Sequence, residues 1–201
     1  DMIFNDALNH ASIIDGCRLS HAATKIYRHN DVEHLATLLS ATGTIRRRVI
    51  VTESVFAMDG DLAPLSDLAN VAKQYDALLV VDEAHATGVF GSHGGGLVQE
   101  LELGAHVDVQ IGTLSKAIGA LGGYVAGSQT LIDTLINEAR TFIYTTALPP
   151  SVAASATAAI QVITQEPERR EQLWQNTRFL RKALDAAGYH INPGNSPILP
   201  V

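Results

Sequence analysis

The residues of this sequence with the clearest chemical potential lie in two short motifs, each at the end of an apolar run typical of a strand. Asp82 begins the sequence Asp-Glu-Ala-His and follows the apolar run 77–81, and Lys116 lies within Gly-Thr-Leu-Ser-Lys-Ala-Ile-Gly at 112–119. Taken singly, a carboxylate that caps a turn and a lysine in a polar loop are the simpler interpretations. In a parallel sheet, however, ligands bind beyond the carboxyl ends of the strands, where both residues are expected.

Together, the carboxylate and the lysine suit pyridoxal 5'-phosphate (PLP). Lys116, among small and apolar neighbours, could act as a Schiff-base nucleophile. Asp82 could pair with the pyridinium nitrogen, so that the protonated ring accepts electrons from the α-carbon of a substrate. Thr113 and Ser115 offer hydroxyl groups to a phosphate, and His10 could stack on the ring. A structural histidine at the start of a helix is an equally open interpretation of His10.

Two other kinds of site fit single motifs less well. Asp-Glu-Ala-His also marks the magnesium motif of helicase-type ATPases, which need an upstream phosphate loop of the form Gly-x4-Gly-Lys-Ser/Thr, and these 201 residues contain none. No metal is expected, because His85 and His93 lie eight residues apart in a glycine-rich stretch without cysteine or acidic residues at ligand spacing.

The elements that must position these motifs alternate between strand and helix patterns. Strands are expected at 25–28, 48–52, 77–81, 107–112 and 123–126, and a further strand from Tyr189. Helices are expected from an Asp31 cap through Leu39, at about 64–75, from a Ser128 cap to about 140, from Pro149-Pro150 onward, and at about 169–187 before Gly188. This order predicts an α/β fold, a three-layer, mainly parallel sheet with the apolar strand 77–81 in its middle. Residues 1–150 would form part of a large PLP-binding domain, and residues 151–201 linking helices and the start of a smaller C-terminal α+β domain.

Composition narrows the class of protein. The 201 residues are 46% hydrophobic and 17% charged, with a net charge of -7, which argues against a nucleic-acid-binding surface. Cys17 stands alone, so no intrachain disulfide is expected, and a reducing cytoplasm suits it. No signal peptide and no apolar run of about 18 residues is present, so no membrane partner is expected. The chain starts without Met and stops as an apolar segment begins, so we expect a piece of a longer protein.

Four motifs stand in the order seen in the α-oxoamine synthases, at 9–16, 52–61, 82–88 and 112–116, and 144–150 is similar as well. The sequence therefore resembles this family of fold-type I PLP enzymes, which join an amino acid to an acyl thioester with loss of carbon dioxide. The resemblance covers essentially the whole chain. It also implies a homodimer with shared active sites. The family's glycine-rich segment would precede Asp1 and its carboxylate-binding arginine would follow Val201, so we expect residues 1–201 alone to be inactive.

The resemblance assigns a role to each matching position. Lys116 would hold PLP as an imine and move the α-proton, and His10 would stack on the ring. The remaining cofactor-binding positions are Asp82 at the ring nitrogen, His85 at the phenolic oxygen, Thr113 at the phosphate, and Thr145 or Thr146 at the phosphate of the neighbouring subunit. Ala57 stands near the cofactor where the family usually has Ser, which should weaken the hold on the phenolic oxygen without removing the imine chemistry.

Members of the family differ in their substrates. The motifs at 59–65, 84–88 and 195–198 look most like the biotin-pathway member, which joins alanine to a pimeloyl thioester of CoA or of a carrier protein. Glycine with acetyl-CoA or with succinyl-CoA, and serine with a long acyl chain, remain alternatives. A further alternative is an inactive partner subunit of the same fold, although such subunits typically lack the lysine that stands here at 116.

Overall fold

A single six-stranded sheet organises the computed structural model, which describes residues 1–191 and 194–201. The strands are β1 (Met2–Asp6), β2 (Ala23–Tyr27), β3 (Arg48–Glu53), β4 (Ala77–Asp82), β5 (Val109–Thr113) and β6 (Gly123–Gly127). Their order is β2-β1-β3-β4-β5-β6, and only β6 runs antiparallel to its neighbour. The sheet is therefore mainly parallel, with β4 inside it, as the sequence predicts.

Helices follow the strands along the chain. They are α1 (Ala11–Leu19), α2 (Val32–Ser40), α3 (Leu65–Gln74), α4 (Leu97–Glu100), α5 (Gln129–Glu138), α6 (Arg140–Ile143), α7 (Pro150–Gln165) and α8 (Glu168–Ala186). The expected caps are confirmed: Asp31 accepts a hydrogen bond from the N–H of His34 at 2.7 Å, and Ser128 accepts one from the N–H of Leu131 at 3.3 Å. None of the described helices has the length and apolarity that a membrane crossing requires.

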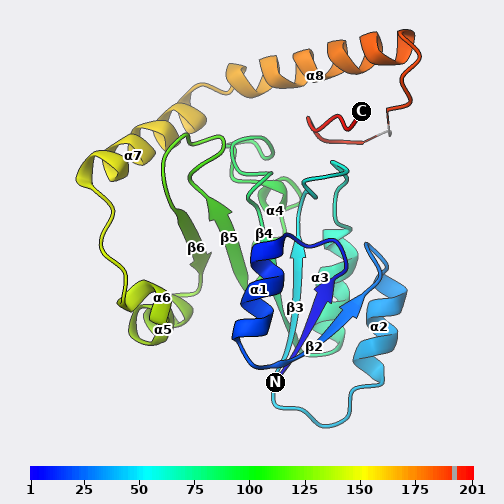
Figure 1. The fold of residues 1–201 in the computed structure, drawn as a ribbon, viewed down its shortest axis with the longest axis vertical. Helices are drawn as coiled ribbons and strands as arrows, with labels where there is room; N and C mark the ends of the chain where they lie inside the picture. The colour runs from blue at the N-terminus through cyan, green and yellow to red at the C-terminus, as the bar shows by residue number, and fades with distance from the viewer. Residues whose placement is uncertain (192–193) are drawn as a thin grey trace.

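The two faces of the sheet pack into separate apolar clusters, because neighbouring residues of a strand point to opposite faces. Ile50 and Leu79 are fully buried in the larger cluster, where side chains of α2 and α3 pack against them. Val51, the neighbour of Ile50, packs with Cys17 of α1 in the smaller cluster. Helices therefore lie on both faces, which confirms the three-layer α/β architecture (Figure 1).

The sequence patterns did not identify β1, α1, α4 or α6, and the reason is clearest for β1 and α4. β1 is only five residues long and ends in two polar residues, yet it lies between β2 and β3 with Asn5 and Asp6 buried. α4 is a single turn, too short to show a helical period. Tertiary contacts, rather than local pattern, determine both elements.

The strand expected from Tyr189 is wrong for the residues that the structure describes, since 189–191 and 194–201 form no strand. Ser196 Oγ instead donates to the carbonyl of Gly60 at 2.5 Å, and Arg181 Nη2 donates to the carbonyl of Gly194 at 2.9 Å. A strand needs a neighbouring strand edge, and these contacts hold the segment on the loop after β3 and on α8 instead.

Candidate active site

A cavity of about 370 Å³ lies at the carboxyl ends of β3, β4 and β5. Its lining includes most of the residues that the sequence singles out, namely His10, Asp82, His85, Thr113 and Lys116. Glu53, Ser12 and Ser115 add further polar groups. These side chains lie together because β3, β4 and β5 are parallel, and parallel strands end at the same edge of the sheet. Glu53 lies opposite Asp82, and Asp82 lies opposite Ile111.

Lys116 is held by a histidine rather than by a carboxylate. Its Nζ lies 2.9 Å from Nε2 of His85. Burial lowers the pKa of His85, and the nearby positive charge of Lys116 lowers it further. His85 is therefore neutral near pH 7, and its Nε2 accepts a hydrogen bond from the lysine. This contact directs the amine toward the loop after β4, next to the end of the strand where Asp82 lies.

Asp82, the last residue of β4, and Glu83, which follows it, make different contacts. Asp82 lines the cavity and is half-buried, and its Oδ1 accepts a hydrogen bond from the N–H of Ala84 at 2.8 Å. Glu83 is buried and faces away, accepting hydrogen bonds from the N–H groups of Leu97 and Val98 at the start of α4. The alternation of side chains along the chain thus places one carboxylate in the cavity and uses the other to secure the fold.

The turn before Lys116 carries a pair of hydroxyl groups. Thr113 Oγ1 lies 2.7 Å from Ser115 Oγ, and the N–H of Ser115 donates to Thr113 Oγ1 at 3.2 Å. Both residues line the cavity. Hydroxyl groups in this position could donate hydrogen bonds to phosphate oxygens of a bound ligand.

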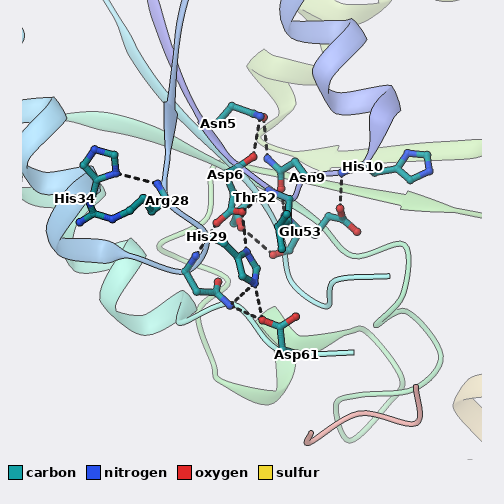
Figure 2. A network of polar contacts seen from close by, with 12 residues as sticks. Asn5, Asp6, Asn9, His10, Arg28, His29, His34, Thr52, Glu53 and Asp61 are labelled. Atoms are coloured by element: carbon teal, nitrogen blue, oxygen red, sulfur yellow. Dashed lines mark hydrogen bonds and ion pairs between the residues drawn. The ribbon is translucent and has the colours of Figure 1, made fainter. Parts of the chain in front are cut away.

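His10 reaches the cavity from the loop between β1 and α1, and its side chain is exposed. Two reciprocal hydrogen bonds fix this loop on β3. Asn9 Oδ1 accepts from the N–H of Glu53 at 2.9 Å, and Glu53 Oε1 accepts from the N–H of His10 at 2.6 Å (Figure 2). Glu53 is not among the residues predicted for the site, although it directly follows the predicted strand 48–52, just as Asp82 follows 77–81.

Three of the predicted positions lie outside the lining of this cavity. Ala57 is half-buried in the turn after β3. Thr145 and Thr146 are exposed between α6 and α7. Their assigned roles, like those of the residues in the cavity, stay predictions.

The sequence pattern of the aminotransferase class I and II family matches residues 1–201. The chain belongs to this family. The Asp-Glu-Ala-His motif at 82–85 thus begins at the end of β4 in an aminotransferase-family chain, and the interpretation as a helicase-type ATPase is wrong. The match also agrees with the α/β architecture and with a cavity at the carboxyl ends of the strands.

Relatives within the aminotransferase class I and II family narrow the comparison. The chain is 47% identical to the 8-amino-7-oxononanoate synthase of Bacillus pumilus, over 100% of this chain and 51% of that protein. It also matches the structure of a serine palmitoyltransferase from S. paucimobilis with a bound PLP–myriocin aldimine, with TM-score 0.93 and 36% identity over 99% of this chain and 51% of that one. The 8-amino-7-oxononanoate synthase of Francisella tularensis matches with TM-score 0.81 and 32% identity over 99% and 58%.

These matches confirm the resemblance to α-oxoamine synthases on which the assigned roles rest. The chain spans about half the length of the curated relatives it matches.

Proposed function

We propose that this chain is part of an 8-amino-7-oxononanoate synthase, a PLP-dependent acyltransferase of biotin biosynthesis. The enzyme would condense L-alanine with a pimeloyl thioester, of CoA or of a carrier protein, and release carbon dioxide. The observation that carries the proposal is the single cavity in which Lys116 and Asp82 meet His85, Thr113 and His10. Curated relatives of that name, 47% to 49% identical over the whole chain, support the assignment.

The residues of the cavity fit PLP. A volume of about 370 Å³ lies within the range of about 300–1,000 Å³ that small-molecule sites occupy. The lining includes the primary amine of Lys116, the carboxylate of Asp82 on the neighbouring strand, and the paired hydroxyl groups of Thr113 and Ser115. These groups match an aldehyde, a ring nitrogen and a phosphate respectively. When bound, PLP supplies an aldehyde that reacts with amines and a pyridinium ring that accepts the electron pair of a carbanion.

The chain's own residues would then divide the work. Lys116 would attach the cofactor and move the proton of the substrate's α-carbon, a transfer worth about 10²–10⁴-fold. Asp82 would hold the proton of the ring nitrogen, and neutral His85 would donate to the phenolic oxygen. Thr113, with Ser115, would bind the phosphate, and His10 would cover one face of the ring.

The choice of substrate rests on sequence rather than on fold. A serine palmitoyltransferase matches with TM-score 0.93 and an 8-amino-7-oxononanoate synthase with 0.81, so the shared architecture does not separate acyl acceptors. The motif Asp-Gly-Asp-Leu-Ala-Pro-Leu at 59–65 favours alanine with a pimeloyl thioester over glycine with acetyl-CoA or succinyl-CoA. The presence of Lys116 in the cavity argues against an inactive partner subunit.

A homodimer and a two-domain division complete the proposal. Exposed apolar side chains gather around the exposed Thr145 and Thr146, which supports an interface there; they include Phe142, Ile143, Tyr144 and Leu148. Residues 1–150 would belong to the large domain, and residues 151–201 to the linking helices and the start of the small one. The buried free thiol of Cys17 is consistent with a cytoplasmic enzyme.

Borohydride trapping tests this function. The full-length protein is mixed with PLP, reduced, digested and mapped, and the label is expected on Lys116. Lys73→Ala, which changes an exposed lysine of α3, should label as the wild type does, whereas Lys116→Ala should not label. L-Alanine, glycine and L-serine are then offered in turn with pimeloyl-CoA, and release of the thiol is expected with alanine. Labelling at a lysine other than 116 would overturn the proposal, and thiol release with glycine alone would correct the substrate.

A further inference from the structure

Glu53 has no role in the site as assigned above, yet it lies at the base of the cavity. We propose that Glu53 is a positioning residue, whose carboxyl group holds the His10 segment over the cavity and supplies a second acidic group beside Asp82. This inference rests on the proposed function, because it concerns the hold of the same residues on the cofactor.

The first half of the inference follows from the contact with His10. Glu53 Oε1 accepts the backbone N–H of His10 at 2.6 Å, and the Glu53 side chain is buried, with the residue 3% exposed. Among the described residues the His10 ring makes hydrogen bonds only locally: its Nδ1 accepts from the N–H of Ser12 at 3.2 Å and lies 2.8 Å from Ser12 Oγ. The place of the ring over the cavity therefore depends on its backbone, and Glu53 holds that backbone on β3 (Figure 2).

The second half follows from the register of the sheet. Glu53 and Asp82 are paired residues on the adjacent parallel strands β3 and β4, so their side chains leave the sheet on the same face. Both line the cavity. The negative charge of Asp82 therefore disfavours the ionised form of Glu53.

Burial, followed by the neighbouring hydrogen bond and charges, sets the pKa of Glu53. Burial raises the pKa of Glu53 to about 7; the hydrogen bond from His10 opposes this shift, and the charge of Asp82 adds to it. Lys116 lowers the pKa of Glu53, and Asp6 at the end of β1 raises it. Glu53 is thus the group that changes charge near neutral pH, while it keeps an oxygen for His10 in either state.

A change of charge at Glu53 should be visible in the cofactor. At a pH above the pKa of Glu53, its carboxylate adds a second negative charge at the edge of the sheet, where Asp82 would face the ring nitrogen. A negative charge there favours the protonated forms of the bound cofactor, so that the colour change which marks their deprotonation occurs at higher pH. At a pH below this pKa, Glu53 is neutral and only Asp82 supplies a negative charge beside the ring nitrogen.

Three variants of the full-length protein loaded with PLP separate the two contributions. Glu53→Gln keeps an oxygen acceptor for His10 but removes the charge. Glu53→Ala removes both. Glu83→Gln is the matched control, because Glu83 is an equally buried glutamate that faces α4 rather than the cavity. For each, the visible absorption is titrated from pH 5.5 to 9, and the circular dichroism of the cofactor band is measured as a report on ring asymmetry.

We expect Glu53→Gln to move the midpoint of the visible titration to lower pH by at least about half a unit, with wild-type circular dichroism. Glu53→Ala should in addition lose about half of the dichroic signal, because His10 is released. Glu83→Gln should leave both readings at the wild-type values. A Glu53→Gln midpoint within 0.1 unit of the wild type overturns the proposal, and it does so even where Glu53→Ala fails to fold. Wild-type dichroism in a folded Glu53→Ala variant overturns it as well.

Failure of the proposed function would look different. In that case the wild-type protein itself would show no reducible band at Lys116, before any variant is compared. A reducible wild-type band with unchanged Glu53 variants refutes only the role of Glu53.

Discussion

Nε2 of His85 and Nζ of Lys116 lie 2.9 Å apart, at the ends of two neighbouring parallel strands. The lysine is thereby held by a neutral ring, and the negative charge of Asp82 remains available to another group in the cavity. A carboxylate in the place of His85 would compete with the cofactor for the amine. The pair explains how an amine and a carboxylate share one small cavity without pairing with each other.

His85→Ala should therefore disturb both the lysine and the cofactor. We expect kcat/KM for the proposed condensation to fall by about 10²-fold, because the amine loses its partner and the phenolic oxygen of PLP loses the donor proposed for it. Steady-state assays of the full-length enzyme measure the effect. His93→Ala alters an exposed histidine outside the lining of the cavity and should retain activity within about twofold. Equal activities in the two variants would contradict the role of His85.

A second histidine, His29, joins the end of β1 to the loop after β3. Nδ1 of His29 lies 2.9 Å from Asp6 Oδ1, and Nε2 lies 2.7 Å from Asp61 Oδ2 (Figure 2). Asp6 ends β1 and Asp61 lies in the loop after β3. The His29 ring therefore connects two segments that lie 55 positions apart in the sequence. Its edge also packs against Phe56, with ring centroids 4.4 Å apart.

This bridge predicts how stability depends on pH. Burial lowers the pKa of His29, but the hydrogen bonds and charges of Asp6 and Asp61 outweigh it, so that the pKa is raised above its ordinary value of 6.5. A raised pKa means that the folded state binds the proton more tightly. The stabilisation is complete below about pH 6.5 and is lost as the pH rises through the folded-state pKa.

Urea unfolding of the full-length protein at pH 6 and at pH 8.5 tests this dependence. His29→Gln should lower the free energy of unfolding by about 2 kcal/mol at pH 6 and by clearly less at pH 8.5. His106→Gln, at an exposed position, should change neither value. If His29→Gln lowered the free energy of unfolding equally at both pH values, the His29 ring would stabilise the fold without being protonated, contrary to this prediction.

The sequence predicts most of the strands and helices, because their apolar periods are long enough to read. It also places Asp82 and Lys116 at the edge of the sheet, since Asp82 follows directly on one recognisable strand and Lys116 lies in the turn after another. The end of β4 shows why such positions can be identified: a buried apolar run leaves its first polar residue at the edge of the sheet.

What the sequence does not show are contacts between segments. The hydrogen bond from His10 to Glu53 joins residues 43 positions apart, and the bridge through His29 depends on a loop after β3. Neither partner carries a local signal for the other. The strand predicted from Tyr189 is wrong for the same reason, because contacts with neighbouring segments, rather than its own apolar residues, determine its conformation.

Glu83 provides a stability prediction at the same strand end. Its buried carboxylate accepts from Ser54 Oγ at 2.8 Å as well as from the N–H groups of Leu97 and Val98. Glu83→Ala leaves these donors without a partner and should lower the free energy of unfolding by about 3 kcal/mol. Hydrogen exchange should show faster exchange at the amides of residues 97 and 98. Glu100→Ala, whose carboxylate accepts one exposed N–H, is the control and should cost less than about 1 kcal/mol. A loss of the same size in both variants would refute the role of Glu83 in holding α4.

Gly112, in the strand that leads to Lys116, has no room for a side chain. A Cβ at this position would overlap the ring of Tyr124 on β6, whose hydroxyl lies 2.8 Å from Thr87 Oγ1. Gly112→Ala must therefore displace either the ring or the strand, and we expect a loss of about 1–3 kcal/mol in stability with weaker PLP binding.

Combining Gly112→Ala with Tyr124→Ala, which frees the space, isolates the cause. If the overlap is responsible, the double variant should lose less than the sum of the two single losses, by at least about 0.5 kcal/mol. Gly43→Ala, where a Cβ meets nothing within 4 Å, should be close to neutral. Strict additivity of the two substitutions would mean that Gly112 is required for its backbone rather than for the close approach of Tyr124. Since β5 and β6 are joined at this pair, the cycle also measures how firmly the antiparallel edge strand holds the segment that carries Lys116.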